Sequence, residues 1–227
     1  MSVLIFDADD TLWENNVHFE RAFDDFVGFL DHSSLTPAQV RDVLNEIELV
    51  NARVHGYGSV NFGRNLQQVY RHLAERAIQP RDLDYVMSLA ERILEQPLEL
   101  IHGVQVTLAE LARRHTLALF TKGHPEEQRL KLDRSGLAQY FSHTGIVKEK
   151  DTAAYSSLVA GQGFDHGQTW MIGNSPKSDI NPALEAGLGA VLVPHERTWV
   201  LECQDVRVPE GARFLRVERF VNLRNCF

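Results

Sequence analysis

The sequence feature that most constrains the fold is a continuous apolar run, Val3-Leu4-Ile5-Phe6, which leads directly into the acidic segment Asp7-Ala8-Asp9-Asp10-Thr11. A run of β-branched and large apolar residues without polar alternation is typical of a strand that is covered on both faces. A carboxylate at the end of such a strand is costly unless it has a partner, and three acids within four positions also repel one another. The segment therefore predicts a buried strand that ends in a cation-binding or catalytic turn.

Strand and helix patterns alternate from about residue 102 onward. Short apolar runs typical of strands lie at 117–120, 144–147, 170–172 and 190–193, and helical segments begin near 104, 125, 152 and 179. This alternation predicts parallel strands joined by right-handed crossovers. We expect an α/β fold with a Rossmann-like parallel sheet core, to which residues 214–217 are a candidate edge strand.

Residues 14–101 interrupt the alternation with mostly helical patterns. Apolar residues recur at helical spacing from Phe19 to Leu30, and Thr36 followed by Pro37 is a helix-start signature. The segment His55-Gly56-Tyr57-Gly58-Ser59 predicts a loop between helices. We predict two domains: an α/β core formed by residues 1–13 and 102–227, and an α-helical cap domain, residues 14–101, inserted after the first strand.

Composition narrows the classes of function. The chain has 31 acidic and 23 basic residues, a formal net charge of −8 and no basic tract, which argues against a large nucleic-acid footprint. The two cysteines, Cys203 and Cys226, give neither a disulfide framework nor a zinc-site spacing. No segment approaches the ~18 apolar residues of a membrane span. We expect no nucleic-acid complex, no membrane association and a cytoplasmic location, and the oligomeric state stays open.

Three polar clusters, at 7–11, 121–123 and 173–179, each follow a predicted strand. Ligands of such sheets bind beyond the carboxyl ends of the strands. Mg²⁺ prefers oxygen ligands and binds through one or two carboxylates plus substrate phosphate. A carboxylate can also attack phosphorus, and in an extended turn Asp9 would point to the same side as Asp7, where it could transfer protons. Taken alone, the acidic turn is equally compatible with a structural cation site.

Taken together, the clusters resemble the haloacid dehalogenase-like (HAD) hydrolase superfamily. The resemblance rests on a hydrophobic strand followed by Asp-x-Asp-x-Thr, a threonine after a second strand, a later lysine, and a Gly-Asn-Ser-x-x-x-Asp cluster, and it covers most of 1–13 and 102–193. It implies Asp7 as nucleophile and Asp9 as general acid/base, with the Asp9 backbone carbonyl as a further Mg²⁺ ligand. It also implies that Thr11 supports the loop beside the substrate.

The second cluster, Thr121-Lys122-Gly123, has a hydroxyl and backbone N–H groups that could hold the non-bridging phosphate oxygens. The resemblance makes Thr121 the phosphate-binding hydroxyl, with Lys122 and Gly123 as substrate contacts, although the tripeptide alone is an ordinary turn. A fixed ammonium would offset the repulsion between aspartate and phosphate. Lys148 and Lys150 are both candidates, and the family's spacing before a helix that carries an aromatic residue, here Tyr155, favours Lys150.

The third cluster runs from Gly173 to Asp179. The family usually has aspartate where this chain has Asn174, whose amide oxygen can ligate Mg²⁺ but brings no negative charge. We therefore expect Asp179 to carry more of the metal binding. The predicted ligand set is Asp7, Asp9, Asn174 and Asp179. Ser178 could also simply cap the next helix.

The same residues select among the chemistries of the family. Dehalogenases lack the second aspartate and need no metal, so Asp9 and Asp179 favour phosphoryl transfer. Phosphonatases use a cap lysine, whereas no lysine lies between Asp7 and Thr121. Tyr57 and Arg64, near the predicted cap loop, are candidate substrate contacts.

The predicted function is hydrolysis of a small phosphorylated metabolite, a phosphomonoester, by a Mg²⁺-dependent phosphatase through an aspartyl-phosphate intermediate. Two alternatives remain open: a catalytically weak metal-binding regulatory or interaction module of the same fold, which Asn174 encourages, and a dehalogenase-type hydrolase.

Overall fold

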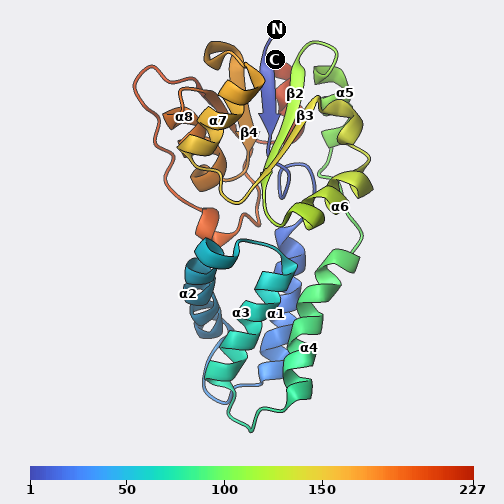
Figure 1. Ribbon diagram of the computed structural model, residues 1–227, viewed down its shortest axis with the longest axis vertical. Helices are drawn as coiled ribbons and strands as arrows, with labels where there is room; N and C mark the ends of the chain where they lie inside the picture. Colours follow the sequence, from blue (N-terminus) through green and yellow to red (C-terminus); the bar gives the residue numbers. More distant parts are fainter. The chain divides into compact units, whose positions relative to one another are not determined.

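The computed structural model describes residues 1–227 and divides into two compact units (Figure 1). The core unit consists of residues 1–15 and 98–227, and the helical unit consists of residues 16–97. The sequence analysis placed the two boundaries after residues 13 and 101.

The core unit contains a six-stranded sheet in which every pair of neighbouring strands is parallel. The strands lie in the order β3-β2-β1-β4-β5-β6. Their bounds are β1 (Val3–Phe6), β2 (Thr116–Lys122), β3 (His143–Val147), β4 (Thr169–Gly173), β5 (Gly189–Leu192) and β6 (Phe214–Arg216). The α/β fold class with a Rossmann-like parallel sheet is confirmed, and β6 is the expected edge strand.

Strand β1 is covered on both faces, as its uninterrupted apolar sequence predicts. Leu4 and Phe6 pack in one hydrophobic cluster with Leu108, whereas Ile5 packs in another with Tyr155. Successive side chains of a strand point to opposite faces, so these two clusters are the two halves of the core. Burial on both sides places the carboxyl end of β1, and the acidic segment after it, between β2 and β4.

Four helices cover the sheet: α5 (Val104–Leu111), α6 (Pro125–Ser135), α7 (Thr152–Gln162) and α8 (Asn181–Glu185). Helices α5 and α6 lie on one side, and α7 and α8 lie on the other (Figure 1). Shorter helical segments are η2 (Ala138–Tyr140), η3 (His166–Gln168), η4 (Pro176–Ile180), η5 (Val200–Glu202) and η6 (Phe220–Asn225). The last predicted helix, expected from about 179, corresponds to α8, and the π-helical turn η4 precedes it. Ser175 caps η4 because its side chain accepts a hydrogen bond from Ser178 N.

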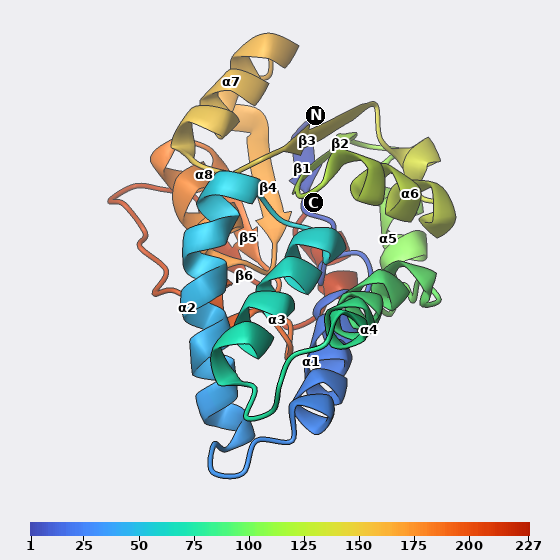
Figure 2. The ribbon, with the colours of Figure 1, turned by 60° about the horizontal axis from the view of Figure 1, so that its bottom comes forward.

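The helical unit contains α1 (Asn16–Leu30), α2 (Pro37–His55), α3 (Ser59–Leu73), α4 (Pro80–Glu91) and the short η1 (Arg92–Glu95). Helix α3 packs between α2 and α4 (Figures 1 and 2). Thr36 caps α2 in a reciprocal capping box with Gln39, as the sequence signature predicts. The predicted break between helices is the loop at 56–58, where Gly56 and Gly58 both have positive φ. None of the helices in the chain combines the length and the apolar character that crossing a membrane requires.

Glu48 is an unusual residue of the helical unit, because its carboxylate is buried and its Oε2 atom has no hydrogen-bond partner. Burial raises the pKa of Glu48 to about 7, against the opposing charge of Arg41 and with the added repulsion of Glu20. Arg41 forms an ion pair with Glu20 at 2.5 Å, so the positive charge of Arg41 is shared between Glu20 and Glu48.

This raised pKa predicts a pH-dependent stability. The folded-state pKa of Glu48 lies above the unfolded value, so the folded state binds the extra proton and loses this stabilisation as the pH rises from about 4.5 to about 7. Glu48→Gln removes the titration. Relative to wild type, the variant should gain on the order of 2 kcal/mol in free energy of unfolding between pH 5 and pH 8, measured by urea denaturation. Glu46→Gln, at an exposed site of the same helix, is the control, and a Glu48→Gln curve parallel to wild type would contradict the assignment.

Candidate active site

Asp7 follows β1 directly and continues its pairing with β4, because its N–H donates to the Ile172 carbonyl at 2.9 Å. Its buried carboxylate has two partners on different oxygens. Lys150 Nζ donates to Oδ1 at 2.5 Å, and Thr11 Oγ1 donates to Oδ2 at 2.9 Å. The backbone thus places the carboxylate, and two polar side chains orient it.

Lys150 is buried and lies at the centre of this arrangement. Its ammonium group donates to Asp7, to Asp179 and to the Phe120 carbonyl, so its three N–H donors have three acceptors. Burial acts to lower the pKa of Lys150, but the charges of Asp179 and Asp7 raise it well above the usual range. The lysine is therefore a fixed cation. Lys148, the alternative candidate, is exposed.

Asp179 lies in η4, and no part of its carboxylate is exposed. Its Oδ2 accepts from the Ser175 N–H at 2.9 Å. Burial and the neighbouring charge of Asp7, opposed by Lys150, together raise the pKa of Asp179 to about 7. Two carboxylates facing one ammonium leave one negative charge uncompensated when both are ionised, and a divalent cation could offset it.

Asn174 lies next to Thr11, the second partner of the Asp7 carboxylate. Thr11 Oγ1 is 3.0 Å from Asn174 Oδ1, and Asn174 N donates back to Thr11 Oγ1 at 3.2 Å. Asn174 thus reaches the Asp7 carboxylate through Thr11, and Asp179 reaches it through Lys150. These three predicted metal ligands belong to one hydrogen-bonded network and offer the oxygen atoms that Mg²⁺ prefers, whereas the side chain of Asp9 has other partners.

Asp9, which an extended turn would point to the same side as Asp7, has its own set of hydrogen-bond partners. Trp13 Nε1 donates to Oδ1 at 2.7 Å, Gln128 Nε2 donates to Oδ2 at 2.8 Å, and Lys131 Nζ donates to both oxygens at 2.6 and 2.7 Å. Although burial acts to raise the pKa of Asp9, Lys131 and these hydrogen bonds lower it. Asp9 has these partners because the backbone after Asp7 forms a tight loop, in which the N–H groups of Thr11 and Leu12 donate to the Ala8 carbonyl.

Thr121 is buried at the end of β2, next to Lys122 and Gly123. The other two residues of this cluster are engaged within the core unit. Lys122 Nζ donates to Glu202 at 2.6 Å and to Ser178 Oγ at 2.8 Å, and the Gly123 N–H donates to the Val147 carbonyl at 3.1 Å. The predicted roles of Lys122 and Gly123 as substrate contacts would need these bonds to change.

Glu202, from η5, is a buried acid that the sequence analysis did not single out. Its Oε2 accepts from Ser175 Oγ at 2.6 Å, and its Oε1 accepts from Lys122. Burial opposes ionisation, but Lys122 and the serine hydrogen bonds lower the pKa of Glu202 below its usual value. The acid therefore ties the segment after β5 to the cluster that carries Asp179.

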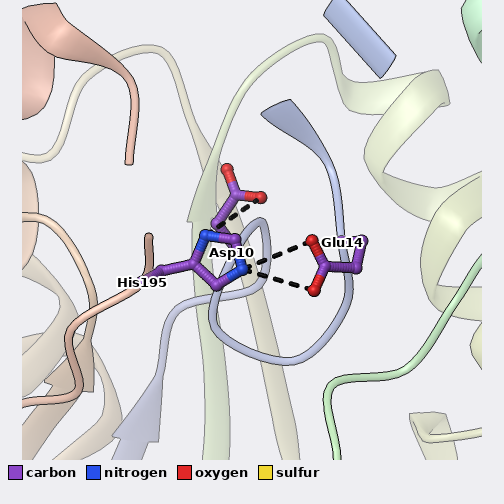
Figure 3. Close-up of side chains that lie close together, drawn as sticks. All are labelled: Asp10, Glu14 and His195. Atoms are coloured by element: carbon purple, nitrogen blue, oxygen red, sulfur yellow. Dashed lines mark hydrogen bonds and ion pairs between the residues drawn. The ribbon is translucent and has the colours of Figure 1, made fainter. Parts of the chain in front are cut away.

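A second tie joins the same segment to the acidic loop (Figure 3). His195 Nε2 lies 3.3 Å from Glu14, and its Nδ1 lies 3.9 Å from Asp10 Oδ1. The three side chains offer ligand atoms within 4.8 Å of one another, close enough for a metal ion to be considered. However, the two imidazole nitrogens face different carboxylates (Figure 3). We interpret the group as a bridge between two loops.

Tyr57 and Arg64, the predicted substrate contacts of the cap, belong to the helical unit. Tyr57 lies in the loop between α2 and α3, and Arg64 Nη1 donates to Asn61 Oδ1 at 3.1 Å. Asn61 in turn donates to the His55 carbonyl at 2.6 Å and so fastens this loop. Their role toward a substrate stays a prediction.

Comparison with known proteins points to one family. The family model of haloacid dehalogenase-like hydrolases matches residues 1–187. A phosphoserine phosphatase from Thermus thermophilus is 38% identical over 117 residues, which are 48% of this chain and 44% of that protein, so the match spans less than half of the relative's length.

Solved structures share the fold along the whole chain. A haloacid dehalogenase-like family hydrolase from Xanthomonas campestris has a TM-score of 0.85 at 26% identity, over 100% of this chain and 94% of that one. An L-2-haloacid dehalogenase from Xanthobacter autotrophicus has a TM-score of 0.67 at 14% identity, over 99% and 97% of the two chains. At that identity the likeness shows the fold alone.

The packing of Asp179 against Gly173 generates a stability prediction. A Cβ atom on Gly173 would lie 2.2 Å from Asp179 Oδ2 and 2.5 Å from its Cγ, so Gly173→Ala must displace the carboxylate. We expect a loss of about 1–3 kcal/mol in free energy of unfolding, measured by urea denaturation. Gly161→Ala, in α7, meets nothing within 4 Å and should gain about 0.5–1 kcal/mol. Equal effects of the two substitutions would be inconsistent with this packing.

Proposed function

Because the chain belongs to the haloacid dehalogenase-like hydrolase family, we propose that it is a Mg²⁺-dependent phosphatase that hydrolyses a small phosphomonoester through an aspartyl phosphate on Asp7. The observation that carries the proposal is the setting of Asp7. Its carboxylate lies at the end of a central strand and accepts hydrogen bonds from the Lys150 ammonium and the Thr11 hydroxyl. Thr121, whose side chain is buried, lies at the end of the adjacent strand.

In the proposed first step, a carboxylate oxygen of Asp7 attacks phosphorus, and the bond between phosphorus and the leaving oxygen breaks. Asp9 gives its proton to that oxygen, so the alcohol leaves neutral. Lys150 offsets the repulsion between Asp7 and the incoming phosphate. Thr121 contributes a hydroxyl donor to a non-bridging phosphate oxygen, where negative charge gathers.

In the second step, water attacks the phosphorus of the acyl phosphate. Asp9, now a carboxylate, takes the proton from that water, and the bond between phosphorus and Asp7 breaks. Inorganic phosphate leaves, and both aspartates return to their starting state. The cycle needs no reagent other than substrate and water.

The oxygen donors present fit a magnesium ion. In this proposal Asp7, Asp179, the Asn174 amide oxygen and the Asp9 backbone carbonyl would hold it. When bound, Mg²⁺ would supply positive charge that offsets the negative charges of the nucleophile and the phosphate. The fit is supported by the pKa of Asp179, which burial and the charge of Asp7 raise to about 7. Asn174 brings no charge, so Asp7 and Asp179 are the anionic ligands.

Two observations favour a phosphatase over the dehalogenase alternative. Asp9 provides the second carboxylate that proton transfer to a leaving alcohol needs, and Asp179 provides an anionic metal ligand. The Thermus thermophilus relative, although matched over part of its length, is a phosphatase. A regulatory module without catalysis is not favoured, because the proposed nucleophile Asp7 and the cation that would offset its repulsion from phosphate, Lys150, are in direct contact.

The substrate class in this proposal is a small phosphorylated metabolite of the cytoplasm. Tyr57 and Arg64 are the proposed contacts from the helical unit, and Arg64 would offer a cation to an anionic substrate. No lysine lies between Asp7 and Thr121, so an imine mechanism with a lysine of the helical unit is not part of the proposal.

The test is release of inorganic phosphate from p-nitrophenyl phosphate. Wild type should turn over with Mg²⁺ and stop when EDTA removes it. Asp7→Asn should lower kcat by at least about 10³-fold, because the nucleophile is lost. Asp84→Asn makes the same change of charge at an exposed site of α4, so it should retain most of the turnover. If Asp7→Asn keeps its activity, another residue is the nucleophile.

A further inference from the structure

Both oxygens of the Asp9 carboxylate accept hydrogen bonds from donors of the core unit. Oδ1 accepts from Trp13 and Lys131, and Oδ2 accepts from Gln128 and Lys131, at distances of 2.6 to 2.8 Å. An ionised carboxylate has about four acceptor positions, two on each oxygen. All four are therefore occupied, and neither oxygen is available to take a proton from water.

The donors that hold Asp9 are themselves anchored. Lys131 Nζ also donates to Asn15 Oδ1 at 3.0 Å, and Gln128 Nε2 also donates to the Lys122 carbonyl at 2.9 Å. Gln128 further packs against Gly123, where a Cβ would come within 2.6 Å of its Nε2. Trp13 has no exposed surface. A rotation about the side-chain bonds of Asp9 would move both of its oxygens away from these donors together.

We propose that Lys131 is a positioning residue that holds Asp9 in a resting position, from which the carboxylate must be released before it can transfer a proton. This inference rests on the proposed function, in which Asp9 is the general acid and base. Lys131 has two of the four contacts and the only full charge among the donors, and charge-assisted hydrogen bonds are roughly twice as strong as neutral ones. Lys131 therefore contributes most of the interaction energy that keeps Asp9 in this position.

Release exchanges hydrogen bonds and needs one proton from water. The contacts from Lys131, Gln128 and Trp13 to Asp9 break, while Lys131 keeps its proton and its bond to Asn15. The freed carboxylate takes up a proton from water, gives it to the leaving oxygen in the first step, and takes one from the attacking water in the second. Lys131 does not touch the reacting atoms in this scheme.

The Trp13 indole N–H reports directly on this contact, because it donates to Asp9 at 2.7 Å. A hydrogen bond to a carboxylate moves an indole proton signal downfield. The chain has three tryptophans, so Trp170→Phe and Trp199→Phe assign the Trp13 signal in ¹⁵N-labelled protein by elimination. Asp9→Asn then marks the position of this signal when the carboxylate is absent.

In ligand-free protein, Lys131→Met should move the Trp13 signal upfield toward the Asp9→Asn position. Lys131→Arg keeps the charge and should leave the signal near that of wild type, an effect that general damage to the fold would not produce. If Lys131→Met leaves the signal unmoved, Lys131 does not hold Asp9, and the proposal fails. This comparison needs neither substrate nor metal.

Mg²⁺ with orthovanadate, a mimic of phosphate, tests the release. The wild-type Trp13 signal should move upfield toward the Asp9→Asn position at the vanadate concentration that inhibits phosphate release. An unmoved signal at that concentration would overturn the release step. Absence of Mg²⁺-dependent phosphate release would instead contradict the proposed function, so the two failures are distinguishable.

Discussion

The contact of Lys150 with Asp7 and Asp179 is the interaction on which the rest of the site depends. A buried ammonium costs several kcal/mol unless its charge and its donors are compensated, and here two carboxylates and the Phe120 carbonyl provide that compensation. The three acceptors come from the ends of β1 and β2 and from η4. The lysine can be buried only if those ends converge, so the order of the strands and the charge balance of the site support each other.

Contacts from distant parts of the sequence hold the loops around this centre. Glu202 binds the cluster at the end of β2 and the segment that carries Asp179. His195 bridges Asp10 and Glu14 of the acidic loop. On the other side, α6 binds Asp9 through Lys131. Two of these ties, Lys122 with Glu202 and Lys131 with Asp9, pair opposite charges that are largely removed from water, where such pairs are screened less than at the surface.

The parallel sheet and the position of Asp7 could be predicted from the sequence, because an apolar strand and the acids after it are local signals. Lys150 could be preferred over Lys148 only through the family's spacing. Lys150 is buried next to Asp7, whereas its role in catalysis stays a prediction. The partners of Asp9 could not be predicted, since they depend on a tight loop and on a helix more than a hundred residues away. Glu202 also lacked a signal, because a single acid in an irregular segment has no periodicity.

The spacing of Gln128 and Lys131 on one face of α6 was the weak signal available for the Asp9 contact.

The central claim is that Asp7, held by Lys150 and Thr11, is the residue that becomes phosphorylated. Acid quenching during turnover of a phosphate ester, followed by mass spectrometry of the N-terminal peptide, tests this most directly. In wild type, we expect one phosphoryl group on Asp7. A phosphoryl group on a different residue, or steady turnover without any phosphorylated intermediate, would contradict it.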